Sequence, residues 1–192
     1  MTTRHQFGLR IANPVRRKID IEEAFSAVSP KVRHAAEAAA QVLQEKGVRF
    51  LLVGGLGVGA NGVPRATKDV DFLVGDEAFD RKGIILSYKP GMPLEADGIA
   101  IDLIPIPMDM PKLDELLTKF QTSEGIPVAP AEVIILMKLT SNRLRDRDDI
   151  NRMLRAGVDF DSARDVVRVY GSEELLAKLE DRIIEAQGEE EP

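Results

Sequence analysis

The alternation of apolar and polar residues predicts β-strands in the first part of the chain. The clearest apolar runs are Arg49–Val53, Val70–Val74 and Ile99–Ile106, which are rich in Val, Ile, Leu or Phe. Ile84–Tyr88 is a shorter run of this kind, and the Pro- and Gly-rich stretch Pro90–Gly98 joins it to the last strand. We therefore expect a mixed sheet of roughly four or five strands.

Helical patterns surround these strands and then replace them. Ser29-Pro30 is typical of an N-cap and a first helical turn, so a helix is expected over Lys31–Lys46. Shorter helices are expected over Gly55–Asn61 and Leu113–Leu117. From Pro130 the periodicity is helical throughout. The helices expected there are Ala131–Thr140, Asp148–Ala156, Asp159–Tyr170 and Ser172–Ala186.

These elements predict an α+β fold, in which an α/β core with a mixed sheet flanked by helices is followed by a helical subdomain. We place a basic arm at residues 1–18, the core at 19–128, and the helical subdomain with its acidic tail at 129–192. The arm contains Arg4, Arg10, Arg16, Arg17 and Lys18 and no acid. Such an arm is either a solvated terminus or a contact for RNA or an acidic partner.

Composition narrows the chemistry. The 192 residues include no Cys, which excludes disulfides and a thiol nucleophile, and only His5 and His34, which gives little support to a zinc site or a Ser-His-Asp triad. The net charge of −6 is not that of a general nucleic-acid binder. No secretory signal or long apolar span is visible, so we expect a cytoplasmic protein without a membrane segment.

Three aspartates form the candidate chemical site. Asp69 and Asp71 are two residues apart at the start of a strand, so their side chains share one face of the sheet. Asp102 lies in another, otherwise apolar strand, where a charge is costly unless it meets water, a partner or a metal. Close carboxylates favour a cation between them, and oxygen ligands favour Mg²⁺. The alternative is a solvated or turn-forming Asp-x-Asp.

The glycine pair Gly54-Gly55 ends the first strand and opens a short helix. Backbone N–H groups at such a helix start can hold phosphate, and glycine allows a close approach of the ligand. The alternative is a strand-to-helix turn that simply needs glycine. The spacing does not fit a dinucleotide-binding fingerprint, and a P-loop is absent because no Gly-Lys-Ser/Thr occurs.

Residues 30–155 resemble the DNA polymerase β-like nucleotidyltransferase superfamily, whose core pattern is an apolar strand, Gly-Gly or Gly-Ser, a short helix, Asp-x-Asp and a later third acid. The series Arg65, Thr67, Asp69, Asp71 looks most like the AbiEii-type branch, which includes toxins of toxin–antitoxin pairs. Lys138 and the later segment Arg145–Ile150 are similar to further motifs of that branch. The Gly-Gly pair departs from the Gly-Ser form, so the hydroxyl that helps hold phosphate is missing.

The resemblance implies transfer of a nucleoside monophosphate from a nucleoside triphosphate to a hydroxyl, with two Mg²⁺ ions. It implies the metal ligands Asp69, Asp71 and Asp102, of which Asp102 could instead be the general base. It implies nucleotide-binding roles for Gly54, Gly55, Arg65, Thr67 and Lys138, and further catalytic-site positions at Lys138, Asp146 and Asp149.

Several of these roles have alternatives. Lys138 lies in an apolar helix and could simply extend its ammonium to water. Arg65 could pair with Asp69 or Asp71. Of Asp146 and Asp149, one is expected to orient Lys138 and the other to cap the helix or activate the acceptor, although Arg145 and Asp149 could also form an ordinary surface pair.

The acceptor is open between a tRNA 3′ end, a protein hydroxyl and a small molecule, and a cognate antitoxin is an implied partner. The alternative function is a catalytically inactive nucleotide-binding or protein-interaction module of the same fold. Glycosidase chemistry does not fit, because it needs two acids across a sugar-sized gap.

Overall fold

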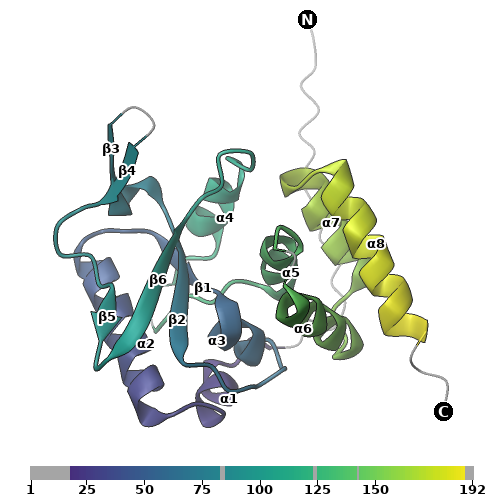
Figure 1. Cartoon of the computed structure of the whole chain (residues 1–192), viewed down its shortest axis with the longest axis horizontal. Helices are drawn as coiled ribbons and strands as arrows, with labels where there is room; N and C mark the ends of the chain where they lie inside the picture. Colours follow the sequence, from purple (N-terminus) through teal and green to yellow (C-terminus); the bar gives the residue numbers. More distant parts are fainter. Residues whose placement is uncertain (1–17, 83–84, 123–124, 142, 189–192) are drawn as a thin grey trace, which may run out of the picture.

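The computed structural model describes residues 18–82, 85–122, 125–141 and 143–188 (Figure 1). Most of the expected basic arm and the acidic tail from residue 189 lie outside these residues. In the described part, an α/β unit carries helices on both faces of a sheet, and the C-terminal helices stand together beside it (Figure 1). The expected fold class, a mixed sheet flanked by helices with a helical C-terminal part, is confirmed.

The main sheet has four strands in the order β1-β2-β6-β5. Strand β1 (Phe50–Leu52) is antiparallel to β2 (Asp69–Val74), and β2 is parallel to β6 (Ile99–Pro105). The short strand β5 (Glu95–Ala96) pairs antiparallel with β6 and lies within the stretch expected to be only a connection. A sequence rich in Pro and Gly conceals a two-residue strand, because pairing with β6 supplies the order that local propensity lacks.

The expectation that Ile84–Tyr88 belongs to this sheet is wrong. Strand β4 (Ile85–Tyr88) pairs instead with β3 (Phe79–Lys82) in a separate two-stranded sheet. All four β4 residues are exposed, Ile85 to 66%. An apolar run therefore predicted a strand correctly but not its burial. Strand β3 was missed because Asp80, Arg81 and Lys82 give it a polar sequence.

Each face of the main sheet has its own apolar core, since side chains alternate along the strands. Phe50, Phe72 and Leu103 face α2 (Pro30–Glu45) and the short α1 (Ile21–Ser26), which the sequence did not reveal. Leu51 and Leu73 face the opposite side. The second core continues from these strands through the C-terminal helices. Asp69, Asp71 and Asp102 stand at alternate positions on this second face.

The helices after β6 are close to the expected ones. They are α4 (Leu113–Lys119), α5 (Ala131–Leu139), α6 (Leu144–Arg155), α7 (Phe160–Tyr170) and α8 (Glu173–Gly188). Helix α6 begins at Leu144 rather than at the expected Asp148, so Asp146 stands in its first turn. Its first residues are charged or exposed and show no apolar periodicity, which explains the late expected start.

The helical part is joined to the sheet by close packing. Val128 forms a parallel bridge with Leu52, and the Leu52 carbonyl accepts from the backbone of Ala129, just before α5. Helix α3 (Gly54–Ala60) packs on α5 so tightly that a Cβ on Gly57 would lie 2.9 Å from Ile134 Cδ1. This packing brings one face of α5 over the carboxylate-bearing face of the sheet. In the described residues, none of the helices has the length and apolar character needed to span a membrane.

Candidate active site

The three aspartates predicted to form a site line one pocket of about 220 Å³. Asp71 and Asp102 are register partners in the parallel pair β2–β6, and Asp69 precedes Asp71 by two residues on the same face. The pocket is completed by Gly54 and Gly55 at the start of α3 and by residues of α5 and α6. The lining also includes residues from both motif regions of the sequence, namely Arg65, Thr67, Lys138 and Asp146.

Gly54 allows Asp71 to lie against the start of α3. Its φ is +57°, a conformation that side-chain-bearing residues rarely adopt, and an added Cβ would lie 1.7 Å from Asp71 Oδ2. The backbone N–H of Gly55 donates a hydrogen bond to the Asp71 carboxylate. A Cβ on Gly55 would stand 2.8 Å from Thr67 Oγ1. Both glycines are therefore needed for close approach, which is more than a turn alone requires.

We expect Gly54→Ala to disturb the site in two ways, through backbone strain at a positive φ and through a clash of the new Cβ with Asp71. Gly47→Ala is the matched control, because Gly47 has φ +65° but nothing within 4 Å of an added Cβ. Both variants should lose about 1 kcal/mol or more of unfolding free energy from backbone strain. Only Gly54→Ala should also lose Mg²⁺ affinity, measured by calorimetric titration. Equal Mg²⁺ affinity in the two variants would contradict the steric role of Gly54.

The surroundings of Asp71 disfavour its negative charge. Burial, followed by the charges of Asp69 and Asp102, raises the pKa of Asp71 from 3.8 to about 6. The Lys138 charge and the Gly55 N–H act in the opposite direction but do not outweigh these effects. The carboxylate is therefore a group that favours a proton or a cation beside it.

The stability of the metal-free protein should fall as the pH rises from about 4 to 7. Folded Asp71 holds its proton more tightly than the unfolded chain, so its stabilising contribution is complete below pH 3.8 and is lost as the pH passes about 6. At roughly 1.4 kcal/mol per pKa unit, the loss is about 3 kcal/mol. Urea denaturation of the wild type and of Asp71→Asn across this range measures it. An equal slope in both proteins would contradict the raised pKa of Asp71.

Thr67 holds Asp69 by donating its hydroxyl hydrogen to Asp69 Oδ1 at 2.5 Å. The resemblance implies a nucleotide-binding role for Thr67; its observed contact is with the Asp69 carboxylate. Within residues 18–82, 85–122, 125–141 and 143–188, no set of three His, Cys, Asp or Glu side chains is already gathered around one point as metal ligands.

The residues nevertheless fit a divalent ion. The donors are carboxylate oxygens, which hard cations prefer, and they share one face at one pocket. Asp102 is exposed, whereas Asp69 and Asp71 are half-buried, so the set is reachable from solvent. The unbalanced charge at Asp71 is what a bound cation would relieve.

A buried charge network connects the sheet unit to the helical part. Asp149 has a fully buried side chain and accepts two hydrogen bonds from Arg65, from Nε to Oδ1 and from Nη2 to Oδ2, both 2.8 Å. Lys138 Nζ lies 2.8 Å from Asp149 Oδ2 and 2.7 Å from Asp146 Oδ1. Arg65 precedes β2, Lys138 lies on α5 and both aspartates lie on α6, so the network joins three segments.

This network decides between several alternatives. Arg65 pairs with Asp149, and the structure shows no ion pair from Arg65 to Asp69 or Asp71 among the described residues. Lys138 has a side chain only 9% exposed, so the expectation of an ammonium reaching out to water is wrong. The surface pair of Arg145 with Asp149 is also wrong, because Asp149 is buried and Arg145 donates to the Ala66 carbonyl.

The two aspartates of α6 have different positions. Asp149 is sealed from solvent, so it positions Arg65 and Lys138 and cannot meet an acceptor hydroxyl. Asp146 lines the pocket. Burial alone would raise the pKa of Asp146, but hydrogen bonds from Lys138 and Ser141 outweigh it and hold the pKa below its usual value. Asp146 is therefore an ionised partner for the Lys138 ammonium.

Sequence reasoning missed several residues of the pocket. Ser141 and Arg143 flank the start of α6, and Ile104, Ile134 and Met137 form the apolar part of the lining. Isoleucines and a methionine in regular elements gave no signal beyond core packing. His34 Nδ1 lies 2.6 Å from Asp97 Oδ2 at an exposed position, apart from the residues that line this pocket.

Comparison with known proteins adds little to this geometry. No family model matches the chain, and no curated protein matches it. One solved crystal structure, of an antigenic nucleotidyltransferase-like protein from Paracoccidioides brasiliensis, is similar with 15% sequence identity and a TM-score of 0.49. The similarity covers 85% of this chain and 91% of that chain. A likeness at this level does not establish a shared activity.

Proposed function

We propose that the protein is a nucleotidyltransferase: a hydroxyl group attacks the α-phosphorus of a nucleoside triphosphate, the bond to the β-phosphate breaks, and pyrophosphate leaves while the nucleoside monophosphate is transferred to the hydroxyl oxygen. The observation that carries the proposal is the convergence of Asp69, Asp71 and Asp102 on one pocket, directly beside the Gly54-Gly55 start of α3. The arrangement combines a site for divalent cations with a backbone turn that can approach phosphate closely. Neither part alone would favour this reaction.

Asp69, Asp71 and Asp102 are the proposed ligands of two Mg²⁺ ions. When bound, such ions neutralise triphosphate charge and lower the pKa of a hydroxyl that they contact. Asp102 is the exposed carboxylate of the three, so it is placed to accept the proton of an incoming hydroxyl. Asp71 is held against Gly55 and has the less accessible position. Thr67 fixes the orientation of Asp69 through its hydroxyl.

Lys138 is the proposed phosphate ligand. Its ammonium lines the same pocket as the carboxylates, and its charge acts on Asp71. Asp146 and Asp149 hold that buried ammonium at 2.7 and 2.8 Å, so it is paired with two carboxylates beside the pocket. Arg65 shares Asp149, so a phosphate contact from its guanidinium is secondary to that pairing.

We expect Lys138→Met to weaken binding of a non-hydrolysable nucleoside triphosphate by about tenfold or more, because a charged hydrogen bond is removed while the volume of the stem remains. Calorimetric titration with analogues of ATP, GTP, CTP and UTP measures the change, and Mg²⁺ affinity should stay near that of the wild type. Lys112→Met, at an exposed position before α4, is the control. Unchanged nucleotide affinity in Lys138→Met would leave Lys138 with a packing role alone.

Narrower proposals rest on the sequence resemblance. They are membership of the AbiEii-type branch, a role as the toxin of a toxin–antitoxin pair, and an acceptor that is a tRNA 3′ end, a protein or a small molecule. A toxin role requires that induced wild-type protein arrest bacterial growth and that an inactive variant of Asp71 not do so. The absence of any arrest would remove the toxin proposal and leave the enzymatic one standing.

A further inference from the structure

A second pocket lies beside the candidate active site, on the helical part of the molecule. It has a volume of about 140 Å³ and is lined by residues of α5, α6 and α8. Lys138 and Ser141 line both pockets, so the two are neighbours across the end of α5. A helix with its side chains is about 10–12 Å across, so the two pockets are separated by roughly this distance.

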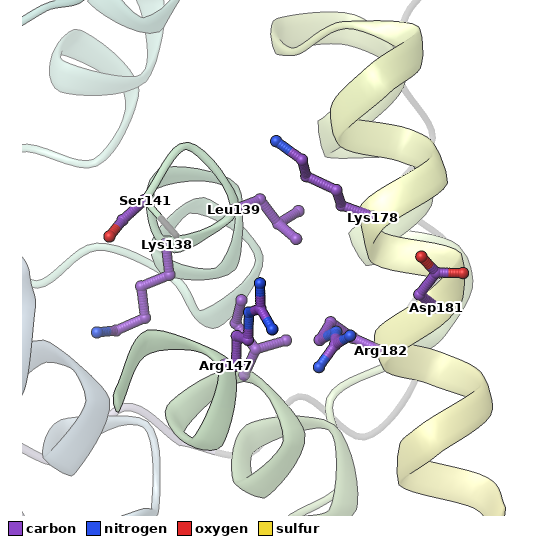
Figure 2. A pocket seen from close by; sticks show the side chains of 8 residues that line it. Lys138, Leu139, Ser141, Arg147, Lys178, Asp181 and Arg182 are labelled. Atoms are coloured by element: carbon purple, nitrogen blue, oxygen red, sulfur yellow. The ribbon is translucent and has the colours of Figure 1, made fainter. Parts of the chain in front are cut away.

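The second pocket is basic, although the chain as a whole is acidic. Its lining includes Arg147 on α6 and Lys178 and Arg182 on α8, against one acid, Asp181. Figure 2 shows Arg147 and Arg182 directed into the space between the two helices, with Lys178 above them on α8. Like charges directed into one space repel, so the arrangement favours an anion there. A chain with net charge −6 has no general reason to gather cations at this point.

The acids that accompany Lys178 and Arg182 lie on the same helix, α8. Lys178 pairs with Glu174 four residues before it, and Arg182 pairs with Glu185 three residues after it. The four side chains of these pairs are 45%, 78%, 17% and 44% exposed, respectively. The exposed pair of Lys178 with Glu174 contributes about 0–1 kcal/mol, so a phosphate group can replace Glu174 at little cost. Arg182 is more buried, and its partner Glu185 also accepts a hydrogen bond from Asn151 Nδ2. The guanidinium of Arg182 can then meet phosphate with two parallel hydrogen bonds.

The size of the pocket and the direction of the Lys138 side chain indicate which phosphate group the pocket binds. At about 140 Å³ it is smaller than the neighbouring pocket of about 220 Å³, and its size suits one anionic group. The ammonium of Lys138 points away from Arg147, Lys178 and Arg182 (Figure 2). A nucleotide held by that ammonium beside Asp71 therefore has its phosphates on the other side of Lys138.

We propose that this pocket binds a phosphodiester group of a single-stranded nucleic acid, which is the acceptor of the transferred nucleotide. The inference rests on the proposed function and selects a nucleic acid among its possible acceptors. Arg147, Lys178 and Arg182 hold the backbone of the acceptor, and its terminal hydroxyl lies at the neighbouring pocket with Asp102. Because the contacts are with phosphate, they position the strand without reading its sequence.

The test is a binding measurement that requires no catalysis. A fluorescein-labelled single-stranded oligonucleotide, as RNA and as DNA, is titrated with the wild type and with a Lys178→Gln/Arg182→Gln double variant, and anisotropy is followed. Removal of charged hydrogen bonds should weaken binding by about tenfold or more. The dependence of log affinity on log salt should become shallower by about 0.7 for each phosphate that the variant no longer neutralises. The tighter of the two oligonucleotides identifies the acceptor chemistry.

Lys31→Gln/Arg168→Gln is the matched control. It also replaces one lysine and one arginine, and so removes the same amount of positive charge. Arg168, like Arg182, pairs with an acid three residues away. Lys31 is exposed on α2, on the opposite face of the sheet. The control should bind the oligonucleotide as the wild type does. Equal binding by both double variants, or no binding by the wild type, overturns the proposal.

The same variants are titrated with a non-hydrolysable nucleoside triphosphate. Unchanged nucleotide affinity in Lys178→Gln/Arg182→Gln is expected. A loss of nucleotide affinity with intact oligonucleotide binding would assign the pocket to the nucleotide's own phosphates and overturn the inference. Failure of the proposed function would give a different result. In that case neither the wild type nor the Lys178→Gln/Arg182→Gln variant would bind the nucleotide.

Discussion

Asp71→Asn should abolish nucleotidyl transfer while the fold remains intact. The variant removes a carboxylate from the set of three at the pocket, and metal-ion stabilisation of a transition state is worth several kcal/mol, so the rate should fall on the order of 10³-fold or more. The amide oxygen can still accept the hydrogen bond of the Gly55 N–H. Turnover with a labelled nucleotide and urea denaturation together measure the two effects.

The stability of this variant separates a site residue from a structural one. Because Asp71 is repelled by Asp69 and Asp102, its neutralisation should leave the unfolding free energy unchanged or higher in the absence of Mg²⁺ at pH 7. Asp80→Asn, at an exposed position of β3, is the control for removal of one negative charge. An unfolded Asp71→Asn, or one with wild-type turnover, would show that Asp71 is not a functional ligand.

Asp149→Asn should have the opposite profile, with a large decrease in stability. Both oxygens of the buried Asp149 carboxylate are used, by Arg65 Nε and Nη2 and by Lys138 Nζ. An amide brings its own N–H donors toward these cations, removes the carboxylate that pairs with Arg65, and leaves Lys138 with Asp146 alone. Breaking a buried pair in this way costs about 3–5 kcal/mol. Urea denaturation at pH 7 measures the decrease.

The neighbouring Asp148→Asn is the matched control for this experiment, because Asp148 is exposed on the same helix. It should change the unfolding free energy by less than about 0.5 kcal/mol. Asp149→Asn should also weaken nucleotide binding, since Lys138 loses one of its two anchors. A cost below about 1 kcal/mol in Asp149→Asn would mean that the network does not hold the sheet unit and the helical part together.

The shared face of the three aspartates could be predicted because it depends on local geometry. Alternation along a strand places Asp69 and Asp71 together, and an acid within the apolar strand of Asp102 marks a special position. The register that sets Asp71 opposite Asp102 was not predictable. It depends on which strands pair, and pairing is decided by the packing of α2 and α5 on the two faces of the sheet.

The partners of the charged residues were the main feature that the sequence did not reveal. Arg65 and Asp149 are 84 positions apart, and each has nearer residues of opposite charge with which a local pattern would pair it. Burial decides the outcome, because a charge sealed beneath α6 must find a partner there. Gly54 shows the same limit, since its need for a left-handed backbone is local but its contact with Asp71 arises only when β2 lies beside α3.

In the hairpin of β3 and β4, apolar residues predict burial that the structure does not show. Ile85, Leu86 and Tyr88 predict a buried strand, yet they are 66%, 36% and 44% exposed. In the described residues, the two apolar cores of the main sheet are formed with α1 and α2 on one side and with the C-terminal helices on the other, and neither core includes Ile85, Leu86 or Tyr88. A further apolar strand therefore has no core to join, and it pairs only with the polar strand beside it.

The most direct test of the proposed activity is transfer of label from a nucleotide. The protein is incubated with Mg²⁺, total cellular nucleic acid or protein, and each of ATP, GTP, CTP and UTP labelled at the α-phosphate. We expect that the wild type labels one pool, that this pool is RNA or DNA if the basic pocket binds the acceptor, and that Asp71→Asn and metal-chelated reactions transfer none. Absence of label in every pool with all four nucleotides, from a folded protein with Mg²⁺ present, would contradict the assignment of Asp69, Asp71 and Asp102 as a nucleotidyl-transfer site.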